Sequence, residues 1–270
     1  AIRELFMARI VTAKGIDRAQ AKFDRVLMPT PAAVLEGARL LAEGVGSEPG
    51  MGDLMVVDPG GATTDVHSIG KGAPAQPGVL LYGLPEPYAK RTVEGDLGMR
   101  YNAQAIAEVA SLEVIARDAG LGVERTREMV SRLVREVGRL PRDDDDRAID
   151  RALASAAVRV AVARHAGRIE TVYTAQGPMR VQHGKDLTQL KAVIGTGGVV
   201  VSAAEPRRVL AAALAEGSDG FSLVPRAAGL WLDHDYLLYA AGLLVELEPA
   251  AAFGLVRSSL TNLDEETTHG

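Results

Sequence analysis

The feature that most constrains the fold is an apolar run at residues 54–57 that leads directly into the octapeptide Asp58–Asp65. Two adjacent glycines and two adjacent threonines lie between its terminal aspartates. Glycine adopts positive φ and lets a ligand approach the main chain, while threonine hydroxyls add donors for phosphate oxygens. The pattern indicates a strand that ends in an anion cradle. A β-hairpin with a tight glycine turn is the alternative interpretation, with the threonines present for strand propensity.

On the first interpretation, the octapeptide binds the phosphates of a nucleotide. Asp58 and Asp65 offer carboxylates to a hydrated Mg²⁺ ion, which keeps several waters and contacts protein through one or two acidic groups. The expected phosphate-binding residues are Asp58, Gly60, Gly61, Ala62, Thr63 and Thr64.

A second glycine cluster lies well over a hundred residues downstream, where the apolar run 192–194 leads into the turn Gly195–Gly198. A strand, a glycine turn and a later helix that begins at Pro206 are typical of a turn that approaches a phosphate or a nucleoside. The separation excludes a single Rossmann unit, and neither turn has the Gly-Lys-Ser/Thr of a Walker loop. We expect both turns to face one cleft, with nucleoside-binding residues Gly195, Thr196, Gly197 and Gly198.

These two turns, together with Thr92–Gly98, resemble the phosphate and adenosine motifs of the actin, sugar kinase and Hsp70-type ATPases. The chain is more similar still to the MutL-type accessory proteins of glutamate mutase, a family unrelated to the mismatch-repair protein of the same name. The resemblance runs over most of the chain and is carried by the stretches 60–68, 91–100, 184–187 and 195–198.

The resemblance implies an α/β fold, namely domain two of an actin-like (ribonuclease H-like) ATPase with a helical insertion. Domain two would comprise residues 51–102 and 166–270, the insertion residues 103–165, and the helical tail of domain one with a connecting helix residues 1–50. Nothing matches the family's first phosphate motif, so we expect a fragment that binds ATP weakly or not at all by itself. Pro59 is a further departure, because proline removes a backbone donor from the cradle.

The function implied by the resemblance is ATP- and Mg²⁺-dependent reactivation or assembly of an adenosylcobalamin-dependent mutase, such as glutamate or amino mutase. The partners expected are that mutase and a second copy of the chain. A small-molecule kinase of the same superfamily is an alternative, with Glu94 or Asp96 as the base for a substrate hydroxyl and Gly98 in the turn that follows. An assembly module that hydrolyses nothing is the third interpretation.

Composition excludes several other functions. The formal net charge of −5 gives no electrostatic case for binding nucleic acid or an anionic membrane. The chain has 0 cysteines, which excludes disulfides, thiolate metal sites and cysteine nucleophiles. Its histidines lack the spacing of a zinc site, and no Gly-x-Ser-x-Gly elbow occurs. No apolar stretch is long enough to span a bilayer, and we expect a cytoplasmic protein.

The helical segments carry signals of their own. A capped start at Thr30-Pro31 precedes a helix whose small residues Ala33, Gly37 and Ala38 let another helix come close. The patterns predict further helices over 102–120, 123–140 and 149–165. We expect the aspartates at 143–146 to cap the last of these, and Asp233 to cap the run that follows it.

The arginines of one predicted helix and the segments expected to form strands carry further signals. The arginines of the 123–140 helix, which are Arg125, Arg132, Arg135 and Arg139, indicate a solvated face, with a docking surface for an acidic partner as the alternative. Strands are expected at 168–173 and around 179–182. The glycines and prolines of residues 70–87 predict irregular structure.

Overall fold

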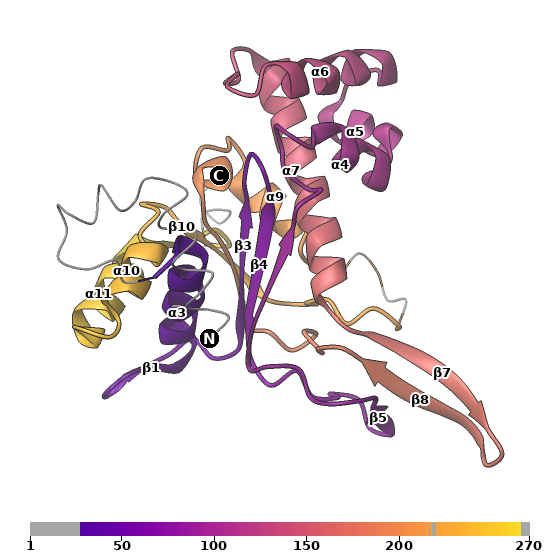
Figure 1. Ribbon diagram of the computed structural model, residues 1–270, viewed down its shortest axis with the longest axis vertical. Helices are drawn as coiled ribbons and strands as arrows, with labels where there is room; N and C mark the ends of the chain where they lie inside the picture. The colour runs from indigo at the N-terminus through magenta and orange to yellow at the C-terminus, as the bar shows by residue number, and fades with distance from the viewer. Residues whose placement is uncertain (1–27, 216, 218–219, 266–270) are drawn as a thin grey trace.

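The computed structural model describes residues 28–215, 217 and 220–265, and the first 27 residues of the tail expected at 1–50 lie outside this range. Its centre is a six-stranded mixed sheet (Figure 1). The strands in spatial order are β11 (Leu260–Asn262), β10 (Gly229–Asp233), β9 (Ala192–Gly195), β3 (Leu54–Pro59), β4 (Thr64–Ile69) and β6 (Ala89–Glu94). β9 pairs in parallel with both β3 and β10, and the other three pairings are antiparallel. Helices cover both faces of the sheet, which confirms the α/β class.

The apolar run in β3 is buried on both faces of the sheet. Met55 and Val57 point into one hydrophobic core and Leu54 and Val56 into the other, and all four side chains are 0% exposed. Successive side chains of a strand point to opposite faces, so a strand covered on both sides needs a continuous apolar run. The sequence at residues 54–57 therefore places β3 at the centre of the sheet.

Three helices cover one face, and two of them cross at very short range. They are α3 (Thr30–Glu43), α10 (Leu238–Leu244) and α11 (Pro249–Ser259). A Cβ on Gly242 would overlap the main chain of Ala33, and one on Gly37 would lie 2.5 Å from the carbonyl oxygen of Leu238. The close approach that the small residues of α3 predict is confirmed. A short hairpin of β1 (Gly44–Val45) and β2 (Glu48–Pro49) follows α3.

The other face is crossed by the long helix α7 (Asp144–His165), which carries α4 (Ala103–Ala110), α5 (Leu112–Ala119) and α6 (Val123–Arg135) at its N-terminal end (Figure 1). The prediction of one helix over 102–120 was wrong, because Ser111 has φ 70° and separates α4 from α5. The Ser111 hydroxyl donates to the Glu113 carboxylate over 2.6 Å, a local bond that competes with helical geometry. The short helices α8 (Gly198–Val201) and α9 (Pro206–Ala211) complete this layer.

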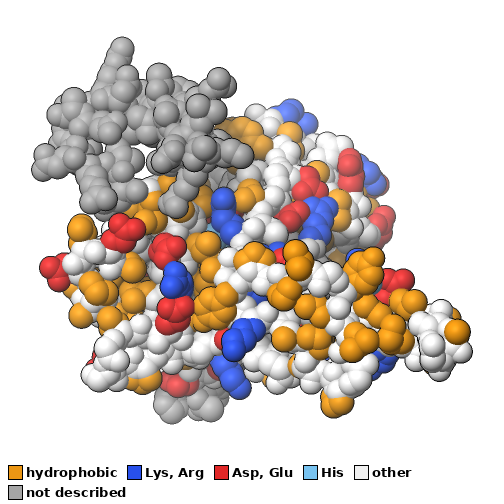
Figure 2. All heavy atoms as spheres, turned by 60° about the horizontal axis from the view of Figure 1, so that its bottom comes forward, with side chains coloured by type: hydrophobic (Ala, Val, Ile, Leu, Met, Phe, Trp, Pro, Cys, Tyr) orange, Lys and Arg blue, Asp and Glu red, His pale blue; other side chains and the backbone are white. Residues whose placement is uncertain are grey.

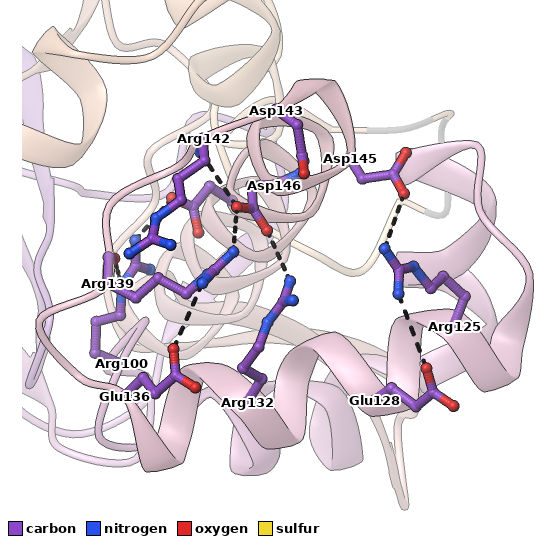
Figure 3. Close-up of polar contacts among 11 residues, drawn as sticks. Arg100, Arg125, Glu128, Arg132, Glu136, Arg139, Arg142, Asp143, Asp145 and Asp146 are labelled. Carbon is purple, nitrogen blue, oxygen red and sulfur yellow. Dashed lines mark hydrogen bonds and ion pairs between the residues drawn. The ribbon is translucent and has the colours of Figure 1, made fainter.

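Ion pairs join α6 to the start of α7 (Figure 3). Asp143 caps α7 as predicted, since its carboxylate accepts a 2.8 Å hydrogen bond from the Asp146 amide. Asp146 is only 4% exposed and accepts from the guanidiniums of Arg132 and Arg139, each at 2.8 Å. The solvated face expected for these arginines was therefore wrong at Arg132 and Arg139. Their role is to neutralise a buried carboxylate, whereas Arg135 is exposed.

A three-stranded sheet projects as an arm from the C-terminal end of α7 (Figure 1). Its strands in spatial order are β5 (Val79–Leu81), β8 (Gly177–His183) and β7 (Arg168–Thr174). The predicted strands at 168–173 and 179–182 are confirmed as the hairpin β7–β8. The short strand β5 lies within residues 70–87, where the prediction of irregular structure was wrong for three residues.

Candidate functional site

The hairpin between β3 and β4 ends in a glycine turn with free main-chain donors. The strands pair as far as Pro59 and Thr64, and the Gly60 amide donates to the Thr63 carbonyl over 2.8 Å. In residues 28–265 as the structure describes them, no hydrogen bond uses the amide N–H of Gly61, Ala62 or Thr63. Consecutive free N–H groups at a turn form a concavity that suits an anion.

The loop after β6 fixes the position of this turn. The amides of Met99 and Arg100 donate to the carbonyls of Gly60 and Gly61 over 3.0 and 2.9 Å. A Cβ on Gly98 would overlap the main chain of Ala62, so only glycine lets the loop approach this closely. Gly98 is therefore not part of the turn. It packs against the turn and holds it in position.

The second glycine turn follows β9 at the same edge of the sheet. β3 and β9 are parallel with Val57 opposite Gly195, and the Thr196 amide donates to the Val57 carbonyl over 3.1 Å. Carboxyl ends of neighbouring parallel strands share one sheet edge, where open α/β sheets bind their ligands. The register of two strands thus brings together turns that are far apart in the sequence.

Both turns line one cavity of about 560 Å³. Asp58, Gly60 and Gly61 line it from the first turn, and Gly197 and Gly198 from the second. The expectation that the two turns face a common cleft is confirmed. Ala62, Thr63, Thr64, Asp65, Gly195 and Thr196 are not among the residues that line the cavity.

Two threonines expected at the ligand are bonded within the protein. The Thr64 hydroxyl is buried and donates to the Leu97 carbonyl over 2.7 Å. The Thr196 hydroxyl is buried and donates to the Asp233 carboxylate over 2.8 Å. Asp233 also accepts from the Leu238 amide at 3.0 Å, which confirms its predicted capping role. These hydroxyls hold the turns in place and do not face the cavity.

Asp58 is the carboxylate between the two turns. Burial, and then the charges of Asp65 and Asp233, raise its pKa to about 7. Asp65 lies directly opposite Asp58 on β4, on the same face of the pair, but the Arg91 guanidinium holds it at 2.6 Å. A magnesium ion at this edge would therefore meet one available carboxylate, that of Asp58. No cluster of three or more metal-binding side chains occurs in the described part of the chain.

The two candidate bases of the kinase interpretation lie outside the cavity. The Arg164 guanidinium binds Glu94 at 2.7 Å and Asp96 at 2.8 and 2.9 Å. The hydrogen bond from Arg164 lowers the pKa of Asp96, and neither residue lines the cavity. Both carboxylates are engaged by Arg164 outside the cavity, so the geometry does not support Glu94 or Asp96 as the base for a substrate hydroxyl.

The opposite wall of the cavity was not predicted. Arg147, Asp150 and Arg151 line it from the first half of α7, and Tyr236 lines it from the segment before α10. Asp150 is bound to Arg100 at 2.7 Å, and burial raises its pKa. Tyr236 has φ 56°, an unusual conformation for a bulky residue. No local pattern could reveal the α7 residues, because they reach the cavity only through tertiary packing.

Comparison of the sequence with known proteins places the chain in a family. A sequence model of the family described as MutL protein matches residues 1–260. The chain belongs to the MutL protein family. A relative in that family, Protein MutL from Clostridium tetanomorphum, is 44% identical over 265 residues. That alignment covers 97% of this chain and 57% of the relative, so the chain spans little more than half the length of that MutL protein.

No helix in the described part of the chain is long and apolar enough to cross a bilayer. The candidate site of this family member is the cavity between the two glycine turns and α7.

Proposed function

We propose that this chain, as domain two of an actin-like ATPase, binds ATP with Mg²⁺ in the cavity between the two glycine turns, and that it binds weakly when it is alone. The observation that carries the proposal is that turns from β3 and β9 line one cavity with the Asp58 carboxylate between them. The free amide of Gly61, which lines the cavity, suits a phosphate oxygen, and Gly198, where nothing lies within 4 Å of a Cβ position, leaves room for a nucleoside. Asp58 would hold hydrated Mg²⁺ through water, and the ion would neutralise phosphate charge.

Within this proposal, the cavity binds a nucleotide and does not hydrolyse it without further groups. Three acidic side chains line it: Asp150 is bound to Arg100 at 2.7 Å, Glu205 is bound to Arg151 at 2.8 Å, and Asp58 is the one that we assign to the hydrated Mg²⁺ ion. A general base needs a free acceptor within hydrogen-bond reach of the attacking water. The assembly-module interpretation is favoured over the kinase interpretation for the described part of the chain.

The biological role we propose is that of an accessory protein for an adenosylcobalamin-dependent mutase, which acts in the cytoplasm. Membership of the MutL family supports this role. Nucleotide would drive the mutase toward an active form only if the two forms of the complex differ in nucleotide affinity. Cobalamin would be bound by the mutase.

Equilibrium dialysis of labelled ATP with Mg²⁺ tests the binding site. A Cβ on Gly61 would meet only the Arg100 side chain at 3.8 Å, so Gly61→Asp adds a charge without a collision. We expect this variant to bind at least about tenfold more weakly, because the new carboxylate repels the phosphates. Gly254→Asp is the matched control, since that position on α11 has nothing within 4 Å. Equal affinity of both variants would contradict the site.

A reactivation assay tests the biological role. A glutamate or amino mutase that has lost activity during turnover is incubated with the protein, ATP and Mg²⁺. We expect activity to return faster than without nucleotide, and Gly61→Asp to abolish the difference. Recovery that does not depend on nucleotide, in a protein that binds ATP by dialysis, would reject the proposed role and leave the site intact.

A further inference from the structure

The arm has an outer edge whose main-chain groups are unpaired. On β7, the Ile169 amide points away from β8 and donates to the Phe221 carbonyl over 2.7 Å. Main-chain groups of alternate residues point to the same side of a strand, so those of Thr171 and Tyr173 also point outward. In the part of the chain that the structure describes, no hydrogen bond uses the N–H or C=O of either residue. The edge therefore offers two donors and two acceptors.

The open stretch of this edge, residues 171–174, has none of the residues that usually protect one. Natural edge strands carry charged side chains, proline or a bulge, which hinder pairing with another chain, and in β7 the charged residues Arg168 and Glu170 come before this stretch. Residues 171–174 are Thr, Val, Tyr and Thr, which all favour strands, and the ladder with β8 is regular to its end. Tyr173 is 83% exposed and Val172 is 38% exposed. An open and regular edge of this kind is a template for one more strand.

On one face of the arm, apolar side chains lie beside the edge together with the charged residue Glu170. Val172 lies opposite Met179, and Val181 lies opposite Leu80, so these four residues share a face. Leu80 is 55% exposed, and Tyr82, next on the same face, is 68% exposed. Figure 2 brings this end of the molecule forward and shows hydrophobic side chains gathered around the arm.

We propose that the β7 edge pairs with the β7 edge of a second copy of this chain, antiparallel and about a two-fold axis through Val172. Thr171 of each copy would exchange both hydrogen bonds with Tyr173 of the other, which satisfies all four outward groups. The residue opposite Glu170 is then Thr174, so no like charges face each other across the axis. The apolar faces of the two arms would join across one six-stranded sheet.

This register is self-complementary, which argues for a second copy over an unrelated strand. A two-fold contact uses the same residues on both sides, and here it pairs β-branched Val172 with itself. The pairing is limited in length, because the Ile169 amide is already bonded to Phe221. Such a small contact predicts a weak dimer whose population depends on protein concentration.

Disulfide trapping tests the register. The chain has 0 cysteines, so a single introduced cysteine can link only to its own copy. Residues opposite each other in a non-hydrogen-bonded antiparallel pair have Cα atoms about 4.5 Å apart, within the range of a disulfide. We expect Val172→Cys to form a covalent dimer under mild oxidation. The matched control Thr174→Cys faces Glu170 in this register and should stay monomeric. Equal linking of both variants, or linking of neither, would overturn the proposal.

Sedimentation equilibrium tests the hydrogen bonds of the edge. Thr171→Pro removes only an outward N–H, and proline is tolerated on edge strands. We expect dimerisation to weaken by about tenfold or more, since one substitution removes two bonds from the symmetric contact. Thr171→Ala keeps the N–H and should dimerise like the parent. Dimerisation that is unchanged in Thr171→Pro, or a parent chain that stays monomeric at all concentrations, would overturn the inference.

Discussion

The carboxylate of Asp58 occupies the space that a Cβ atom on Gly197 would fill. This contact joins the two glycine turns, because Asp58 ends the apolar run of β3 and Gly197 follows β9. Gly197 also has φ 86°, a conformation that residues with a Cβ rarely adopt. Glycine is therefore required at position 197 for two separate reasons. The Asp58 side chain fits where it does only because residue 197 has no Cβ.

Replacing Gly197 with alanine should be costly, and replacing its neighbour should not. We expect Gly197→Ala to lower the free energy of unfolding by about 2 kcal/mol or more, from the positive φ and the collision with Asp58. Gly198→Ala is the matched control, because nothing lies within 4 Å of a Cβ there. Urea unfolding measures both. Adding Asp58→Gly to Gly197→Ala should recover part of the loss, and similar losses for the two alanine variants would contradict this account.

The raised pKa of Asp58, about 7, predicts how stability depends on pH at this site. In the unfolded chain an aspartate loses its proton near pH 4, whereas in the folded protein Asp58 keeps it until about pH 7. Asp58 therefore costs no stability below pH 4, and the cost grows between pH 4 and 7. We expect Asp58→Asn to be stabilised relative to the parent as pH rises through this window, by up to about 1.4 kcal/mol per pH unit. A difference in unfolding free energy that is constant with pH would refute the assignment.

Two buried histidines predict loss of stability in acid. Burial is the first cause that lowers the pKa of His67 and of His165, each to about 3. The unfolded chain binds protons at these residues below about pH 6.5, so stability is full above that pH and falls toward pH 3. We expect a loss of roughly 2 kcal/mol per histidine between pH 6.5 and 5.

The measurement is urea unfolding at both pH values, for the parent and for His165→Gln. His165 bonds to the hydroxyls of Ser68 and Thr92, each at 2.8 Å, so the variant should be less stable at neutral pH and less sensitive to acid. His234→Gln is the control, because the His234 side chain is 67% exposed. An acid sensitivity that is unchanged in His165→Gln would count against this explanation.

The buried carboxylate between α6 and α7 predicts a large effect from a single substitution. Asp146→Ala leaves the guanidiniums of Arg132 and Arg139 without their 2.8 Å partner. We expect a loss of about 3 kcal/mol, since removing one member of a buried ion pair leaves an uncompensated charge. Asp145→Ala is the matched control, because Asp145 is 45% exposed and meets Arg125 at 3.4 Å. Thermal unfolding separates the two, and equal changes would show that Asp146 is not essential to the α6–α7 contact.

The parts of the fold and site that depend on local patterns could be predicted from the sequence. The continuous apolar run at 54–57 identifies a strand buried on both faces, and the glycine turns after β3 and β9 identify the edge that lines the cavity. Small residues identify the face of α3 that meets α10. Asp143 and Asp233 are recognisable as capping residues, because a short acidic side chain before a helix bonds to its first amides.

The parts that depend on tertiary partners could not be predicted. Thr64 and Thr196 have the residue type of phosphate ligands, but Leu97 and Asp233 use their hydroxyls. Lys185 is 0% exposed and donates to the carbonyls of Pro87 and Tyr88 at 3.0 and 2.8 Å, which no sequence pattern indicates. The α7 wall of the cavity likewise follows from packing between distant segments.

The most direct test of the central claim is an NMR titration of the isotope-labelled chain with ATP and Mg²⁺, followed through its glycine amides. The proposed site predicts that the signals of Gly61 and Gly198 move together and report one dissociation constant, while Gly177 on the arm stays fixed. Shifts that spare Gly61 and Gly198, or that report different dissociation constants for the two turns, would contradict a shared nucleotide site.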